Sequence, residues 1–234
     1  MRKFILFALL NFSLLVAPVA AAEAPLLVLG DSLSAAYRIA PESGWVTLLA
    51  QRLRAANPPR EVVNASISGE TTAGGLQRLP ALLAQYKPGV VVVELGANDG
   101  LRGLPLDEIH ANLKKILDAC RATGAKIVLL GIELPLNYGT QYRTGLRQMY
   151  RDAARDFNAP LLPFLLEGVA EDPKLMQEDG LHPVAAAEPR VLENVWPVLA
   201  PVLGVKAQAG TTSAGAPRDP QRSGETTRPR DQKR

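Results

Sequence analysis

A serine stands at the end of an apolar segment, where a turn could expose it. Residues 29–34 read LGDSLS, and a helix is expected to begin there. Backbone amides at such a turn, together with the N-terminus of a helix, can stabilise a developing negative charge. The pattern Gly-x-Ser-x-Gly is absent, since Ser34 follows Leu33, and this argues against the usual nucleophile elbow. Taken alone, the segment is better explained by Asp31 or Ser32 capping a helix.

A carboxylate three residues before a histidine favours the catalytic interpretation. Asp179 and His182 follow the last expected strand. This spacing lets one turn present both side chains in the same direction, so that the acid fixes the imidazole tautomer while the other ring nitrogen faces a nucleophile. The second histidine of the chain, His110, lies in a polar stretch that predicts an exposed helix face. His182 is therefore the better candidate for the base that activates Ser32.

Two turn-like segments could donate hydrogen bonds to an oxyanion. Gly69 follows the second expected strand, and a residue without a side chain can bring its backbone N–H close to a substrate. Asn98 follows the third strand and can offer its side-chain amide. By default each segment is an ordinary turn. Because the serine and the Asp-His pair also follow strands, all of them are expected at one edge of a sheet, where open parallel sheets form their sites.

Short β-rich apolar runs alternate with longer segments of helical periodicity. The run of four valines at 90–93 suits a strand that is buried on both faces. The alternation predicts an α/β fold, a three-layer sandwich in which a five-stranded parallel sheet carries helices on both faces. We expect strands at residues 26–30, 61–67, 90–96, 126–132 and 160–165, and helices at 44–57, 72–86, 105–123 and 143–156. Three prolines within 185–203 predict a short or broken helix there.

The two ends of the chain differ from its middle. Residues 1–22 combine two bases, an apolar run too short for a membrane span and a final Ala-Ala-Ala, which predicts a secretory signal peptide, with an uncleaved anchor as the alternative. Residues 206–234 lack apolar periodicity, which predicts a disordered basic tail. We expect one folded domain at 23–205, exported to the periplasm or secreted, without stable membrane insertion after cleavage.

Composition argues against several other classes. Residues 23–205 hold 17 Lys and Arg against 20 Asp and Glu, whereas a nucleic-acid-binding domain is expected to be basic. The single cysteine, Cys120, can form neither an intramolecular disulfide nor a multi-cysteine zinc site, and its helical context is typical of a buried residue. Histidine is equally scarce, and no complete phosphate-loop motif is present. We therefore expect no nucleic acid, no metal and no cofactor.

Together these motifs resemble the SGNH (GDSL) hydrolase family. The matching features, in family order, are Ser32 in Gly-Asp-Ser-Leu, Gly69 in its own loop, Asn98 in Gly-x-Asn-Asp, and Asp179 with His182 in Asp-x-x-His. Stretches at 64–69, 93–103 and 134–139 are similar to one branch, the exported bacterial thioesterase I group, also described as arylesterase, lysophospholipase and protease I. Departures from this branch at Ala36, Ala97 and Val184 affect substrate fit but remove no catalytic group.

The resemblance implies a flavodoxin-like fold and a monomeric serine esterase. Ser32 is the expected nucleophile, His182 the base and Asp179 its orienting acid, and the oxyanion is held by the amides of Ser32 and Gly69 and by Asn98. The expected substrate-binding residues are Asp31, Leu33, Leu101, Leu134, Leu136 and Tyr138. The implied substrates are small-molecule aryl esters, acyl-CoA-type thioesters and lysophospholipids. A carbohydrate O-deacetylase of the same family and a catalytically inactive binding protein remain as alternatives.

Overall fold

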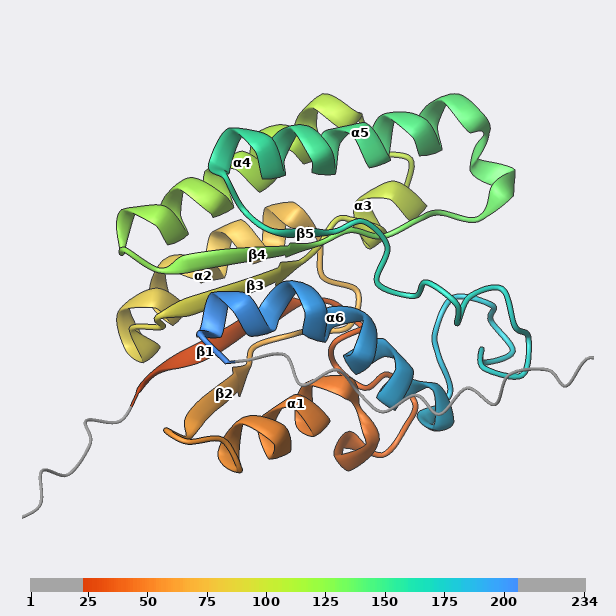
Figure 1. Ribbon diagram of the computed structural model, residues 1–234. Coiled ribbons are helices and arrows are strands. Elements are labelled where there is room, and N and C mark those ends of the chain that lie inside the picture. Colours follow the sequence, from red (N-terminus) through yellow and green to blue (C-terminus); the bar gives the residue numbers. More distant parts are fainter. Residues whose placement is uncertain (1–22, 206–234) are drawn as a thin grey trace, which may run out of the picture.

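The computed structural model describes residues 23–205 and has a five-stranded parallel sheet at its centre (Figure 1). The strands are β1 (Glu23–Gly30), β2 (Arg60–Asn64), β3 (Val90–Glu94), β4 (Lys126–Leu130) and β5 (Leu161–Leu162), in the order β2-β1-β3-β4-β5. The chain moves outward from β1 in one direction to β2 and in the other to β3. The loops after β1 and β3 therefore meet at the switch point of the sheet, where open α/β sheets bind ligands. The expected signal peptide at 1–22 and tail at 206–234 lie outside the described residues.

Helices cover both faces of the sheet, which confirms the predicted three-layer architecture. α1 (Trp45–Arg54) and α6 (Glu188–Leu203) pack together on one face, and α2 (Thr72–Tyr86), α4 (Leu106–Ala122) and α5 (Thr140–Phe157) form the other layer (Figure 1). A short helix, α3 (Ala97–Leu101), follows β3, and single 3-10 turns occur at Pro41–Ser43, Leu136–Tyr138 and Ala185–Ala187. Between residues 23 and 205, none of the helices has the length and apolar character that crossing a membrane requires.

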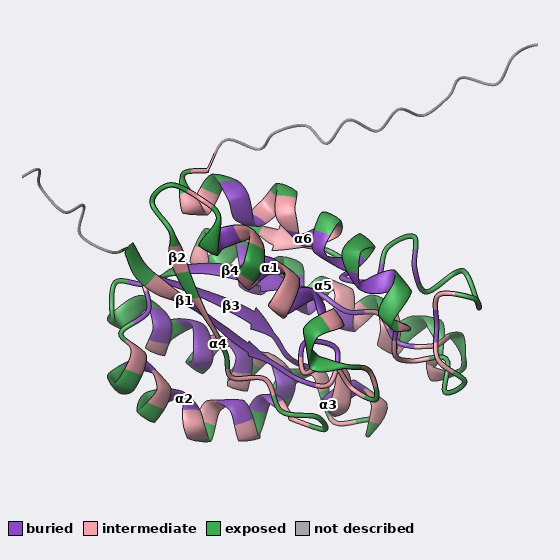
Figure 2. Cartoon of the chain, turned by 90° about the horizontal axis from the view of Figure 1, so that it is seen from below, coloured by how far each residue is buried: buried purple, intermediate pink, exposed green. Residues whose placement is uncertain are grey.

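The core lies along the central strands, which are buried on both faces (Figure 2). Residues 26–29 of β1 and 90–93 of β3 are at most 2% exposed, as the uninterrupted apolar runs predicted. Burial of each large side chain of this kind stabilises the fold by about 1.5–3 kcal/mol. Cys120 on α4 is fully buried, and burial raises the pKa of its thiol to about 12. Cys120 is therefore a residue of the hydrophobic core, as its helical context predicted.

The last strand is shorter than expected. β5 comprises only Leu161–Leu162 instead of 160–165. It pairs with β4 alone and so forms an edge of the sheet. Pro160 and Pro163 stand on either side of it. Because proline has no N–H, neither can donate to the ladder, although the carbonyl of Pro160 accepts the N–H of Leu129 at 2.9 Å. The chain beyond β5 is thereby released into loops that border the site.

The expectation of a short or broken helix at 185–203 is wrong. α6 runs without interruption over 16 residues (Glu188–Leu203). Pro189 stands in the first turn, where its missing N–H has no intrahelical partner to lose. Pro197 and Pro201 do remove hydrogen bonds from the interior of the helix. The helix persists because packing against the core offsets this loss, through the buried side chains of Val191, Leu192, Val195, Leu199 and Ala200.

Candidate active site

The segment that carries Ser32 is a series of turns and not the expected helix. Residues 32–38 have turn geometry, and the first α-helix begins only at Trp45. Left-handed backbone at Ala36 (φ 56°) and Arg38 (φ 54°) is incompatible with a continuous right-handed helix. The predicted assistance from a helix N-terminus behind the serine is therefore absent from this turn.

Two buried carboxyl groups hold this turn in place. Asp31 Oδ1 accepts the N–H of Leu33 at 3.0 Å, while Glu94 Oε2 accepts the N–H of Asp31 at 3.2 Å and the hydroxyl of Ser34 at 2.8 Å. Burial raises the pKa of Asp31 to about 6. Burial, and after it the charge of Asp31, raises the pKa of Glu94 well above its usual value. Both shifts favour the neutral form of the carboxyl group, and burial is the main cause in each case.

The Asp-His pair lies in a narrow loop ahead of α6. An antiparallel bridge joins Met176 to Pro183 at the base of the loop, and the N–H of Gln177 donates to the carbonyl of His182 at 2.7 Å. At the tip, Asp179 Oδ1 accepts the backbone N–H groups of Leu181 (2.9 Å) and His182 (3.1 Å). Both side chains are thus fixed by the backbone of their own loop.

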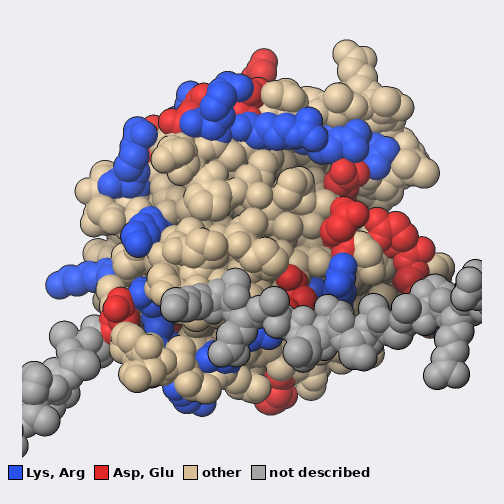
Figure 3. Space-filling model, in the orientation of Figure 1, with Lys and Arg blue, Asp and Glu red and all other residues tan. Residues whose placement is uncertain are grey.

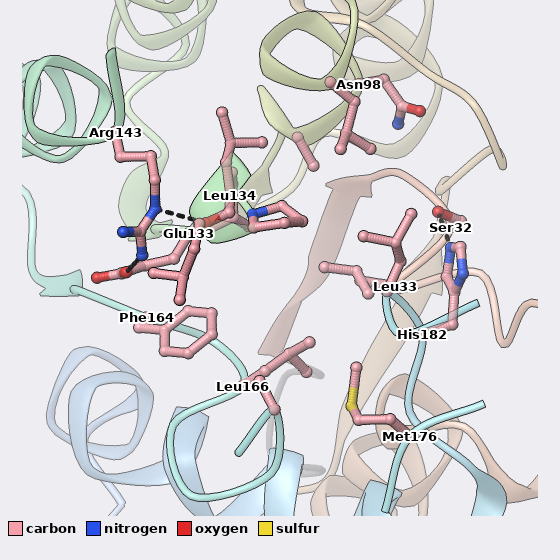
Figure 4. A pocket seen from close by; sticks show the side chains of 18 of the residues that line it. Ser32, Leu33, Asn98, Glu133, Leu134, Arg143, Phe164, Leu166, Met176 and His182 are labelled. Atoms are coloured by element: carbon pink, nitrogen blue, oxygen red, sulfur yellow. Dashed lines mark hydrogen bonds and ion pairs between the residues drawn. The ribbon is translucent and has the colours of Figure 1, made fainter. Parts of the chain in front are cut away.

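Asp179, His182 and Ser32 form one hydrogen-bonded line. Asp179 Oδ2 lies 2.8 Å from His182 Nδ1, and His182 Nε2 lies 2.8 Å from Ser32 Oγ, a contact visible in Figure 4. Partial burial raises the pKa of the Asp179 carboxyl, but the two backbone N–H groups and the imidazole outweigh this effect and hold the pKa below its usual value. An ionised carboxylate only accepts, so the proton of neutral His182 sits on Nδ1 and its Nε2 accepts the serine hydroxyl. This is the arrangement that a general base needs.

Asn98 stands beside the serine in α3. Its Nδ2 donates one hydrogen to Asp31 Oδ2 at 3.1 Å, which leaves the second N–H free to face the cavity that Asn98 lines. The helix is preceded by Gly96 at φ 119°, where a Cβ would lie 2.5 Å from the hydroxyl of Tyr150. Only glycine fits this approach, and it sets the position from which Asn98 reaches the site.

Gly69 lies in the exposed loop after β2. Its φ is 81°, and an added Cβ would have no neighbour within 4 Å. Backbone conformation, and not lack of space, is therefore the reason for a glycine here. The carbonyl of Gly69 accepts Arg102 Nη2 at 3.1 Å, which ties the loop to the end of α3. Gly69 is not among the residues that line the cavity next to Ser32.

A cavity of about 410 Å³ opens beside Ser32 and His182 (Figure 4). This volume falls within the usual range for a small-molecule site. Of the residues expected at the site, the cavity is lined by Ser32, Leu33, Asn98, Leu101, Leu134, Leu136 and His182. Its wall is mostly apolar, and Leu136 at 80% exposure is one of the most exposed large hydrophobic side chains of the described residues. Such a cavity could hold an apolar group of a substrate while a neighbouring bond lies next to Ser32 and His182.

Two expected substrate-binding residues lie behind the wall. Asp31 is fully buried and accepts hydrogen bonds from Leu33 and Asn98, so it supports the turn that carries Ser32 instead of lining the cavity. Tyr138 donates its hydroxyl to the carbonyl of Leu101 at 2.9 Å and is likewise outside the lining.

His110, expected to be exposed, is half-buried on α4. No group of three or more His, Cys, Asp or Glu side chains that could hold a metal comes together within residues 23–205.

Twelve of the 19 residues that line the cavity were not among the candidates named from the sequence. Phe164 and Leu166 follow β5, and Met176 opens the loop of His182. Glu133 and Arg143 form a charged part of the wall. The available signal was positional, since 133 and 164–166 also follow strands, but these residues belong to no recognisable motif. Two further lining residues, Ala97 and Pro135, lie in stretches that the sequence analysis singled out without naming them as site residues. The others are Ile132, Ala170, Glu171, Gly180 and Leu181.

Known proteins are similar to this chain in sequence and in fold. The GDSL-like Lipase/Acylhydrolase family model matches residues 28–188. Esterase TesA of Pseudomonas aeruginosa is 52% identical over 183 residues, 78% of this chain and 91% of the relative. Thioesterase 1/protease 1/lysophospholipase L1 of Escherichia coli (strain K12) is 44% identical over 184 residues, 79% of this chain and 87% of the relative.

A solved structure agrees with these relatives. The psychrotrophic esterase EstA from Pseudoalteromonas sp., inhibited by monoethylphosphonate, has a TM-score of 0.74 and 40% identity and covers 78% of this chain and 100% of its own. The residues matched by the family model include both the serine turn and the Asp-His loop. This chain is therefore an esterase that belongs to the GDSL-like lipase/acylhydrolase family.

Proposed function

We propose that this esterase cleaves acyl esters and thioesters through an acyl-serine intermediate on Ser32. The observation that carries the proposal is the continuous line from Asp179 through His182 to Ser32, with 2.8 Å at both junctions. Each group can act as the proposal requires. The Asp179 carboxylate is held by two backbone N–H groups and orients the imidazole of His182, and the hydroxyl of Ser32 borders the cavity.

In the first half-reaction Ser32 Oγ attacks the acyl carbonyl while His182 Nε2 takes its proton. The imidazolium formed is stabilised by Asp179, which stays ionised. The collapse of the tetrahedral intermediate breaks the bond to the leaving oxygen or sulfur, and His182 protonates that atom. Water then attacks the acyl-serine with the same histidine as base, and the free acid and the resting enzyme are released.

The oxyanion of each tetrahedral intermediate is held, in this proposal, by Asn98 and by the backbone amides of Ser32 and Gly69. Asn98 supports this role best, since one of its side-chain hydrogens is committed to Asp31 and the other remains available at the cavity. The anchored amide is preorganised, which is what makes such donors effective. Gly69 would act from its loop, whose left-handed backbone sets the direction of its N–H.

The substrate class follows from the cavity and from the relatives. An apolar cavity of about 410 Å³ suits an acyl chain, with the leaving group directed to solvent. The names of the relatives include esterase, thioesterase and lysophospholipase, and we extend these activities to this chain. An O-deacetylase would need little apolar surface beyond the serine, so the cavity favours longer acyl groups. An inactive binding protein would have no need of a Ser32–His182 contact at 2.8 Å.

We also infer that residues 1–22 direct export and that residues 206–234 form a separate basic tail, both from the sequence pattern alone. The mature enzyme would then meet lipids and esters outside the cytoplasm as a monomer. Fractionation of expressing cells tests this, since the enzyme should leave the cytoplasm only when 1–22 are present.

Replacing Ser32 tests the proposed chemistry. Ser32→Ala should lower kcat by at least about 10⁴-fold with the fold intact. Ser34→Ala is the matched control, because the hydroxyl of Ser34 donates to Glu94 and does not border the cavity. That variant should lose far less activity. Ester hydrolysis by a folded Ser32→Ala at the wild-type rate would overturn the proposal.

A further inference from the structure

A charged cluster forms part of the wall of the otherwise apolar cavity. Arg143 Nη2 donates to Glu133 Oε2 at 3.1 Å, and Arg147 Nη1 donates to Glu133 Oε1 at 3.1 Å. Arg143 Nε also donates to the carbonyl of Leu134 at 2.7 Å. Glu133 and Arg143 line the cavity, whereas Arg147 does not. The catalytic line does not use this cluster.

The cluster and the catalytic groups lie at opposite ends of the cavity. Figure 4 shows Ser32 and His182 on one side and Glu133 with Arg143 on the other. Leucine, phenylalanine and methionine side chains occupy the space between the two ends, and the labelled ones are Leu33, Leu134, Phe164, Leu166 and Met176. An acyl chain attached to the serine and lying along these walls would point its methyl end at the charged cluster.

Several hydrogen bonds hold the cluster in place. One carboxylate is shared between two guanidinium groups, and charge-assisted hydrogen bonds of this kind are the strong ones. Arg143 is in addition tied to the main chain at Leu134 and is 17% exposed. Its helix, α5, carries arginines at 143, 147, 151 and 155, and Figure 3 shows the basic side chains running along it. Arg143 is the member of this series that borders the cavity.

We propose that Glu133 and Arg143 set the upper limit on the length of the acyl chain that this enzyme accepts. The inference rests on the proposed function and specifies its substrates. Each methylene buried along the apolar walls should raise kcat/KM about fourfold. A chain that reaches the ion pair must strip water from it, and the desolvation of charges costs far more than one methylene contributes. The gain should therefore stop abruptly at one chain length.

The experiment measures kcat/KM for p-nitrophenyl esters from acetyl to palmitoyl with the full enzyme. Two variants change the charge at this end of the cavity. Arg143→Met removes the guanidinium and leaves the carboxylate of Glu133, whereas the double variant Glu133→Gln with Arg143→Met removes both charges. Arg147→Met is the matched control, since it breaks the other ion pair of the same carboxylate without touching the lining. Below the limit all forms should show the same increment per methylene.

The proposal expects a break in the wild-type series and its displacement to longer chains in the two variants. Room for two more methylenes would raise kcat/KM for the first excluded esters about 15-fold, whereas Arg147→Met should keep the wild-type break. A wild-type series that rises without a break to palmitoyl overturns the inference even if no variant folds. An unmoved break in the folded double variant, or an equal shift in Arg147→Met, also overturns it. Failure of the unaltered enzyme on every ester would instead contradict the proposed function.

Discussion

Asn98 offers the sharpest separation between a catalytic and a supporting role, because its side-chain amide has two hydrogens with different tasks. One is donated to the buried Asp31 at 3.1 Å, and the other is assigned to the oxyanion. Asn98→Ala removes both. Loss of the oxyanion donor should lower kcat by about 10²–10³-fold, with kcat/KM falling in parallel, because the interaction is made in the transition state. Loss of the donor to Asp31 should cost about 1–3 kcal/mol of unfolding free energy.

Two assays measure these effects separately. Saturation kinetics on a short p-nitrophenyl ester give kcat, and urea unfolding gives the free energy of unfolding. Asn194→Ala is the matched control, because Asn194 Nδ2 donates to the carbonyls of Leu165 (3.0 Å) and Glu167 (2.8 Å) outside the cavity lining. It should lose stability of a similar order and keep its kcat. A loss of stability in Asn98→Ala with kcat less than tenfold lower would refute the oxyanion role.

Two further perturbations test the surroundings of the site. Asp179→Asn should keep the fold but lower kcat by about 10³–10⁴-fold, because an amide can donate to Nδ1 and favour the wrong tautomer of His182, and a loss below tenfold in steady-state assays would speak against the orienting role. Glu188, 2% exposed, accepts the N–H of Trp45 at 2.8 Å, and burial raises its pKa to about 7 from 4.5. Because the pKa is higher in the folded state, protonation of Glu188 contributes to the free energy of unfolding fully below pH 4.5. This contribution, about 3 kcal/mol in all, is lost as the pH rises through 7. Glu188→Gln should remove that decline from urea unfolding curves recorded between pH 5 and 8, and an unchanged decline would place its origin elsewhere.

The sheet could be predicted from the sequence because its strands are short, apolar and separated by turns. The run at 90–93 is buried on both faces as expected, and α2 has the predicted bounds of 72–86. Pro197 and Pro201 led to the wrong prediction of a broken helix. The hydrogen bonds that they remove can be inferred from the sequence, whereas the packing of α6 that offsets this loss cannot. At β5 the influence of proline was underestimated. The apolar pattern alone predicted a strand over 160–165, whereas the strand between the two prolines comprises only Leu161–Leu162.

The proximity of Asp179, His182 and Ser32 was predictable because each of them sits in a short motif. Asp179 and His182 are three residues apart, and the loop between them closes locally. The place of Asp31 was not predictable, since its side chain accepts a hydrogen bond from Asn98, which is 67 residues away. The charged end of the cavity was missed for the same reason. Glu133 and Arg143 meet only after β4 and α5 have packed.

Labelling of Ser32 tests the central claim most directly. The full chain is treated with a fluorophosphonate, digested and analysed by mass spectrometry alongside the loss of esterase activity. We predict one phosphonyl group on the peptide that contains Ser32, formed in step with inactivation, and labelling slowed by at least about 10²-fold in His182→Ala. Inactivation with the adduct on another residue, or equally rapid labelling of Ser32 without His182, would contradict the proposed catalytic line.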